Sequence, residues 1–324
     1  MIRKHTRRAV KAAFAVSIGV ALLIGVTACG GDGSGTTAGA GSGADTSAAA
    51  VDKSKTPVKI GSKNFTEQFV LGQLYKQALE AKGYTVTYKE NIGSSELIDT
   101  ALTSGEINFY PEYLGIIVQV LAHQTSPDTE EGTYQAAKTF EEGRGFTLLD
   151  RTPFTDSDSF TVLKTTADKY GLQTIEDLAK VKDQKVSYAG FPECRTRPTC
   201  LLGLQNTYGL KDIKFVPLAS ISVYTLLDQA KVFGGDGFTT DPPLGSGKYV
   251  ILDDTKHIFG FQNVAPIVSQ DVTDALGSEF TDTVNSVSAL LTTDAMIAMN
   301  KAVAVDKKQP ADVAQQFLAA NGLT

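Results

Sequence analysis

The decisive stretch of this sequence is IGSKNFTEQF, residues Ile60–Phe69. The apolar run that enters it predicts a strand, and Gly61 lets the backbone turn closely off the end of that strand. Apolar residues then recur at helical spacing until Gly83, a residue typical of the position just past a helix end. Asn64 or Thr66 is expected to cap this helix. The stretch therefore predicts a strand, a short loop and a helix.

The loop in this unit is a candidate binding position. Ligands of open α/β sheets bind at the carboxyl ends of strands. Lys63 lies in the loop, next to the predicted helix N-terminus, and both features attract an anion. From these residues alone, a ligand contact and a solvated loop lysine are equally open interpretations of Lys63.

The first residues of the chain have the pattern of an export signal, residues 1–28. Basic residues precede an apolar run, Ala12–Val26, which is too short for a membrane span and is followed by a polar, glycine-rich tract. The run ends in VTAC and resembles a bacterial lipobox, so Cys29 is expected to carry lipid. An ordinary signal peptide that happens to contain a cysteine is the alternative. Residues 29–56, mostly Gly, Ala, Ser and Thr, predict a flexible tether.

Composition limits the function of the exported part. Removing the five basic residues of 1–28 from the total of 30 leaves 25 against 36 acidic residues, a formal charge of −11. An acidic chain without a basic run argues against nucleic-acid binding. Residues 57–324 are enough for one large domain or two lobes. Strand-like and helix-like stretches alternate along them, which predicts an α/β fold with mostly parallel sheets.

Two cysteines lie in the exported part, Cys194 and Cys200. An exported protein with two cysteines six residues apart is expected to join them in a disulfide. Metal binding by the pair is a weaker alternative, because His5, His123 and His257 lack ligand spacing.

Enzyme signatures are missing from the sequence. It has no Gly-x-Ser-x-Gly elbow, no phosphate-binding loop and no His-Glu-x-x-His motif. Asp156 and Asp158 could form a carboxylate pair, but a polar loop that enters a strand at Phe160 accounts for them without catalysis. We therefore expect no catalytic residue, no metal and no cofactor.

Six motifs distributed over residues 57–324 point to one family. They are GSKNFTEQ at Gly61–Gln68, NIGSS at Asn91–Ser95, YPEYLG at Tyr110–Gly115, RP at Arg197-Pro198, TTD at Thr239–Asp241 and NVAP at Asn263–Pro266. In combination they resemble the substrate-binding lipoproteins of glycine betaine/choline/carnitine (osmoprotectant) ABC importers.

The resemblance implies an α/β fold of the type II periplasmic-binding-protein kind. Such a protein is a two-lobed clamp, with a mostly parallel sheet flanked by helices in each lobe and the ligand cleft between them. The first lobe is expected to contain residues 57–155 plus 263–324, and the second lobe residues 156–262.

The resemblance also implies roles for individual residues. Lys63 and Arg197 match positions that hold a ligand carboxylate, as cations with several N–H donors can. Tyr113 matches one wall of an aromatic cage that holds a quaternary ammonium by cation–π contact. Asp156 matches a position that faces the cation.

The sequence departs from the family pattern around this cage. Positions where relatives have further cage tyrosines hold Asp158, Phe238 and Gln262, and Ile116 replaces a threonine that helps to bind the carboxylate. Other rings could come from Tyr110, Tyr188 and Tyr224, although core packing is the better interpretation of these three. A larger zwitterion, or a polar cation that is not trimethylated, fits the remaining groups about as well as glycine betaine.

We therefore expect a monomeric substrate-binding protein, exported and anchored by lipid to the outer face of the cytoplasmic membrane. It would deliver a quaternary-ammonium or related zwitterionic solute to ABC permease subunits. The alternatives are the same fold with a different small polar ligand, an enzyme on that fold, and a scaffold or sensor lipoprotein.

The lipobox generates a prediction about anchoring. Cys29→Ala should release the protein from the membrane, because the lipid would have no attachment point. Detergent-phase partitioning after expression in a lipoprotein-competent host measures this. Wild-type protein that stays in the aqueous phase would contradict it.

Overall fold

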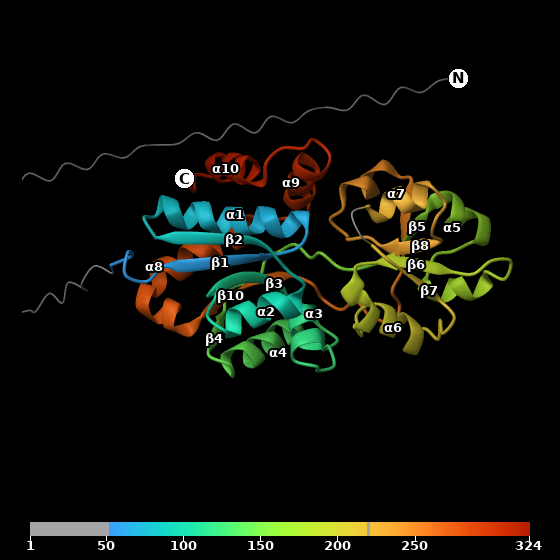
Figure 1. Ribbon diagram of the computed structural model, residues 1–324, viewed down its shortest axis with the longest axis horizontal. Helices are drawn as coiled ribbons and strands as arrows, with labels where there is room; N and C mark the ends of the chain where they lie inside the picture. Colours follow the sequence, from blue (N-terminus) through green and yellow to red (C-terminus); the bar gives the residue numbers. More distant parts are fainter. Residues whose placement is uncertain (1–51, 219–220) are drawn as a thin grey trace, which may run out of the picture. The chain divides into compact units, whose positions relative to one another are not determined.

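The computed structural model describes residues 52–218 and 221–324. These residues form two α/β lobes, each with its own five-stranded sheet and its own hydrophobic cores (Figure 1). The expected export signal, Cys29 and most of the expected tether lie outside the described residues. Among the described helices, none is long and apolar enough to cross a membrane.

The sheet of the first lobe has the strand order β2-β1-β3-β10-β4. Its strands are β1 (Val58–Lys63), β2 (Val86–Gly93), β3 (Phe109–Tyr113), β4 (Phe146–Leu148) and β10 (Val264–Ser269). β1 pairs in parallel with β2 and β3, and β10 pairs antiparallel with β3 and β4.

The sheet of the second lobe repeats this arrangement in the order β7-β6-β8-β5-β9. Its strands are β5 (Phe160–Leu163), β6 (Ser187–Gly190), β7 (Lys214–Pro217), β8 (Gly234–Asp236) and β9 (Tyr249–Leu252). β6 pairs in parallel with β7 and β8, and β5 pairs antiparallel with β8 and β9.

Both sheets are therefore mixed, and in each of them four of the five strands run in the same direction, in agreement with the expected mostly parallel sheets. The two antiparallel strands, β5 and β10, are the ones that follow a crossover from one lobe to the other. The crossover segments run side by side, since Thr155 bridges Asn263 and the Asp156 amide donates to the Gln262 carbonyl at 3.1 Å. A strand that enters its sheet from a crossover starts where β1, β3, β6 and β8 end, so it runs against them.

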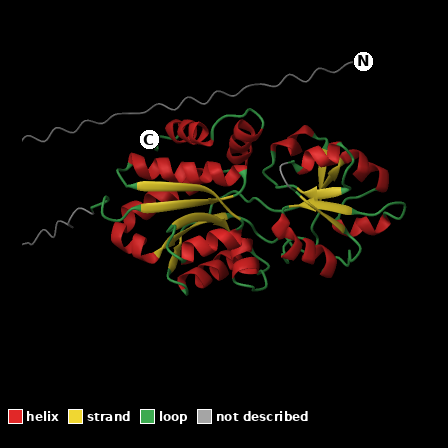
Figure 2. Cartoon of the chain, viewed as in Figure 1, coloured by secondary structure: helices red, strands yellow, loops and turns green. Residues whose placement is uncertain are grey.

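Helices cover both faces of each sheet (Figure 2). In the first lobe, one face carries α1 (Thr66–Ala81), α8 (Gln270–Leu290), α9 (Thr293–Ala304) and α10 (Pro310–Ala320), and the other carries α2 (Ser95–Thr103), α3 (Leu114–Ile116), the π-helix η1 (Ile117–Leu121) and α4 (Glu130–Glu142). The second lobe has α5 (Lys164–Tyr170), α6 (Leu201–Asn206), α7 (Val223–Asp228) and the 3₁₀ helices η2 (Ile175–Lys180), η3 (Pro192–Thr196) and η4 (Pro242–Ser246).

The decisive stretch folds into a strand, a loop and a helix in the expected order, but β1 continues to Lys63, so Gly61 lies within the strand and Lys63 is its last residue rather than a loop residue. Gly83 has a φ of 81°, which confirms it as the left-handed residue past the helix end. The expected cap is wrong, because the capping position is Phe65 and no side chain bonds the first amides. Phe65 instead turns its ring onto Tyr113 and Phe238.

The helix that follows β3 starts at Leu114. Pro111 lies inside β3 and faces Pro266 of β10. A proline lacks an amide donor and is normally excluded from central strands. The Pro266 carbonyl accepts from the Leu149 amide at 2.9 Å, so the polar backbone atoms of Pro266 are directed toward the β4 side and the pair needs no hydrogen bond between the two prolines.

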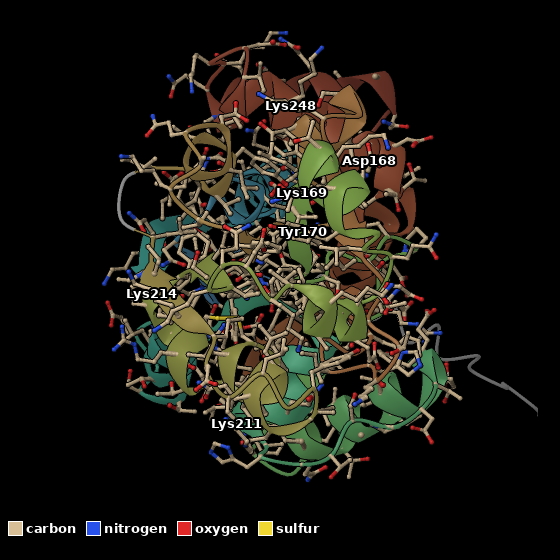
Figure 3. All side chains as sticks on the ribbon, turned by 90° about the vertical axis from the view of Figure 1, so that its right-hand side faces the viewer. Asp168, Lys169, Tyr170, Lys211, Lys214 and Lys248 are labelled. Carbon is tan, nitrogen blue, oxygen red and sulfur yellow. A yellow bond between two sulfur atoms is a disulfide. The ribbon has the colours of Figure 1, made fainter. Side chains whose placement is uncertain are left out.

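Cys194 and Cys200 form the expected disulfide, with their Cα atoms 5.2 Å apart. Both cysteines are buried in the second lobe, and the yellow bond in Figure 3 marks the pair. The bond closes the short loop that carries Arg197.

The outer face of the second lobe carries dispersed lysines. Lys169, Lys211, Lys214 and Lys248 lie apart from one another in Figure 3. Lys169 and Lys248 have carboxylate partners, Asp183 and Asp228.

The disulfide generates a prediction about stability. Replacing both Cys194 and Cys200 by Ser should lower the free energy of unfolding by about 2 kcal/mol, because the unfolded chain gains the freedom of a short loop. Denaturant titration of wild type and variant measures this, with reduced wild type as the matched control. Equal stability of all three would contradict it.

Candidate ligand-binding site

A pocket lies where the two lobes meet, at the carboxyl ends of their parallel strands. Lys63 ends β1, Tyr113 ends β3 and Asp236 ends β8, and Phe191 directly follows β6. This is the edge at which open α/β sheets bind ligands. The sequence predicted the position of Lys63 at this edge correctly.

All seven predicted ligand residues line this ligand pocket. They are Lys63, Tyr113, Asp156, Asp158, Arg197, Phe238 and Gln262, and Ile116 lies with them. The free volume is only ≈ 50 Å³, room for roughly four water molecules. The structure thus brings the predicted set together in a nearly closed pocket, while the role of each residue stays a prediction.

Lys63 is held by a buried ion pair. Its ammonium donates to Glu112 Oε1 at 2.5 Å and to Ser95 Oγ at 3.1 Å, and its nitrogen lies 4.2 Å from the centre of the Tyr113 ring. Burial lowers the pKa of Lys63, and the attraction of Glu112 opposes that shift. An ammonium has three N–H donors, so one remains for a ligand.

Arg197 is bound across the lobes by Glu96. Its Nε and one terminal nitrogen donate to the two carboxylate oxygens of Glu96 at 3.1 and 2.8 Å. Burial favours a raised pKa for Glu96, but the hydrogen bonds and charge of Arg197 outweigh it and lower the pKa to about 2. A guanidinium has five N–H donors, so Arg197 keeps further donors for the pocket.

Four aromatic rings form a row between the lobes, called the aromatic row here. Tyr113 and Phe65 come from the first lobe, and Phe238 and Phe191 from the second. Neighbouring ring centres are 6.1, 5.2 and 6.1 Å apart, and all three pairs are stacked. The Lys63 nitrogen lies 4.2 Å from the Tyr113 ring centre and 5.5 Å from the Phe65 ring centre, so this internal cation contacts Tyr113 most closely and the phenylalanines are the rings more available to a ligand cation.

Carboxyl groups outnumber cations in the pocket. Asp156, Asp158, Glu193 and Asp236 line it, against Lys63 and Arg197. Burial raises the pKa of Asp158, while the charges of Arg197 and Lys63 lower it. Burial and the neighbouring Asp158 raise the pKa of Asp236 well above its usual range. The two aspartates therefore lie close enough to compete for ionisation.

Glu67 joins the lobes behind the aromatic row. Its carboxyl accepts from Tyr113 Oη at 2.8 Å, from Thr240 Oγ1 at 2.7 Å and from Asn300 Nδ2 at 2.9 Å. Thr240 belongs to the second lobe, and its amide also donates to Asp156 at 3.0 Å. The sequence analysis did not identify this junction, because Thr240 lies 173 residues from Glu67.

Other important residues were also missed by the sequence analysis. Phe65 and Glu112 stand inside the quoted motifs, and Phe191 follows a strand end, so motif and position could have found them. Glu96 carried no such signal, because its partner lies 101 residues away.

The alternative tyrosines lie elsewhere. Tyr110 and Tyr188 are fully buried in the cores, and Tyr224 donates to Asp241 outside the ligand pocket. The one potential metal cluster among the described residues is Cys194, Cys200 and Asp236. The disulfide uses both sulfurs, so these residues do not fit a metal.

Comparisons with known proteins agree with this fold and pocket. A family model described as the substrate binding domain of ABC-type glycine betaine transport systems matches residues 56–320. The glycine-betaine-binding protein of Pseudomonas aeruginosa is 31% identical over 273 residues, which cover 81% of this chain and 86% of that protein. The carnitine transport binding protein OpuCC of Listeria monocytogenes is 24% identical over 271 residues, covering 83% and 88%.

Among solved structures, a glycine betaine/carnitine/choline ABC transporter structure has a TM-score of 0.67 at 23% identity, covering 82% of this chain and 99% of that one. This likeness supports the type II periplasmic-binding-protein fold. The family is one of transport proteins that work outside the cytoplasm, and it is not an enzyme family. The chain belongs to the family of substrate-binding domains of ABC-type glycine betaine transport systems.

Proposed function

We propose that this protein captures a small quaternary-ammonium cation or zwitterion and delivers it to the membrane permease of an ABC importer. The observation that carries the proposal is the aromatic row, with two rings from each lobe beside an excess of carboxyl groups. Aromatic faces attract a quaternary ammonium by cation–π contact, worth roughly 0.5–2 kcal/mol for each ring.

The cationic head of the ligand would lie against Phe65 and Phe238, with Asp156 and Asp158 balancing its charge. A ligand carboxylate would take the unused N–H donors of Lys63 and Arg197. Both cations line the pocket and interact with each other electrostatically. In this proposed binding mode, the cationic end and the carboxylate end of a zwitterion contact different groups of the pocket.

The charges around the pocket favour a cationic ligand over a neutral one. Glu112 and Glu96 already balance Lys63 and Arg197. Asp158 interacts with the same two cations, so it competes with any carboxylate that the ligand brings. Choline has no carboxylate, so it does not compete with Asp158 for the two cations, whereas the carboxylate of glycine betaine does.

Closure would depend on contacts that cross between the lobes. We place the lobe boundaries at residues 57–155 plus 263–324 and 156–262, because the paired crossover segments contain Thr155 and Asn263. The bonds from Arg197 to Glu96 and from Thr240 to Glu67 join residues on the two sides of these boundaries. A ligand that adds further contacts to both lobes stabilises the closed arrangement.

Lipid on Cys29 would keep the protein near its permease. The proposal rests on the lipobox-like VTAC and on the glycine-rich segment that follows it. We further propose that the protein acts as a monomer on the outer face of the cytoplasmic membrane.

Asp158 separates the two ligand types. Asp158→Asn should lower choline affinity about tenfold, equal to about 1.4 kcal/mol, because a charge near the cation is lost. Glycine betaine should lose less, because its carboxylate is also relieved of repulsion. Titration calorimetry with both ligands measures the ratio, and Asp168→Asn on the outer face (Figure 3) is the matched control.

The pH dependence has a defined sign. A bound cation favours ionised Asp158 and Asp236, whose pKa values are raised in the free protein. Choline affinity should therefore increase as the pH rises through these pKa values, and Asp158→Asn should flatten the increase. A flat wild-type profile, with choline and betaine equally affected by Asp158→Asn, would show that Asp158 does not face the cation.

Glu96 tests the closure contact. Glu96→Gln should weaken choline and glycine betaine alike, about twofold to fivefold, since a partly exposed ion pair contributes modestly. Because the pKa of Glu96 is lowered to about 2, the ion pair is fully present at pH values above the ordinary carboxyl pKa and is lost as the pH falls through about 2. Glu142→Gln, in a surface pair with Lys138, is the control. A gain restricted to glycine betaine would instead identify Glu96 as a competitor of the ligand carboxylate.

A further inference from the structure

A second chamber adjoins the ligand pocket and shares the Phe65–Phe238 ring pair with it. Its free volume is ≈ 360 Å³, against ≈ 50 Å³ for the ligand pocket. It receives Asn300 and Ala304 from α9 of the first lobe and Thr240 from the second lobe. A ligand held only in the ligand pocket leaves this larger space empty.

The polar chemistry of the chamber suits a hydrogen-bond donor. Glu67, Asp156 and Asp241 are among the described residues that line the chamber, and no lysine, arginine or histidine is among them. Asn300 is 5% exposed, and its Nδ2 donates to Glu67 at 2.9 Å and to Thr240 at 3.2 Å. These two bonds fix the amide orientation and leave Oδ1 without a partner in the described chain.

The apolar part of the chamber is also unusual. Val305 and Ile221, from opposite lobes, line it and are 53% and 50% exposed. They are two of the three large apolar side chains reported as exposed in the described chain. The chamber therefore has an apolar part to which both lobes contribute.

We propose that the chamber is the subsite for an extension of the ligand, an apolar segment that carries an O–H or N–H donor. The ligand is then a quaternary-ammonium cation or zwitterion larger than glycine betaine. Its charged end occupies the ligand pocket, its extension passes the Phe65–Phe238 pair, and its donor meets Asn300 Oδ1. This inference rests on the proposed function and names the substrate class more narrowly.

Three probes and two variants test the subsite by titration calorimetry. The probes are glycine betaine, phenylalanine betaine and tyrosine betaine, and the last two differ only by the phenol O–H. Ala304→Trp fills the chamber from an exposed helical position, and Ala289→Trp on α8, also exposed, is the matched control. Thermal melts establish that both variants fold. If Ala304→Trp does not fold, Val305→Trp replaces it.

Tyrosine betaine should bind wild type at least tenfold more tightly than glycine betaine and at least threefold more tightly than phenylalanine betaine. Ala304→Trp should abolish the tenfold advantage and leave glycine betaine within twofold, and Ala289→Trp should change nothing. Extended betaines that bind no better than glycine betaine, or an advantage that survives Ala304→Trp, overturn the subsite. Equal affinities for the two aromatic betaines overturn the role of Asn300. If choline and all three betaines fail to bind, the proposed function itself fails.

Discussion

The buried ion pair between Lys63 and Glu112 is the constraint on which the site depends. A lone ammonium at the end of β1 would be costly to bury, so its charge needs a partner inside the protein. Glu112 supplies that partner and also accepts from the Tyr113 amide at 2.8 Å. One carboxylate therefore fixes the ends of β1 and β3 together.

The pair also determines how the aromatic groups are used. With the Lys63 ammonium over the Tyr113 ring, that ring stabilises an internal cation. The rings more available to a ligand cation are Phe65, Phe238 and Phe191, which are distributed over both lobes. Rings that come from two lobes make the affinity for a cation depend on closure.

The mixed sheets explain why the charged groups collect in one place. In each lobe, parallel strands end at the pocket, and the strand after the crossover begins there. Asp158 precedes β5 and Gln262 precedes β10, so both crossovers bring polar residues to the same edge. Lys63 and Asp236 reach that edge from strand ends. The pocket is therefore a consequence of strand direction in both sheets.

The sequence by itself determined the strand–loop–helix unit at Ile60–Phe69 and the disulfide partners, and its motifs, through their resemblance to a known family, supplied seven of the residues that line the pocket. Local spacing and short motifs carry that information, because they report on a few neighbouring residues at a time. Pro111 shows the limit, since its place in β3 depends on Pro266 in a strand that arrives 155 residues later.

Only the tertiary structure decided how the pocket charges are balanced. Hydrogen bonds join Lys63 to Glu112, Arg197 to Glu96 and Thr240 to Glu67, over separations of 49, 101 and 173 residues. No local pattern encodes such pairings, because any acidic residue of the chain is a possible partner until the fold brings one of them within hydrogen-bond distance. The physical reason is burial: charges that leave water must be paired, and the fold selects the partner.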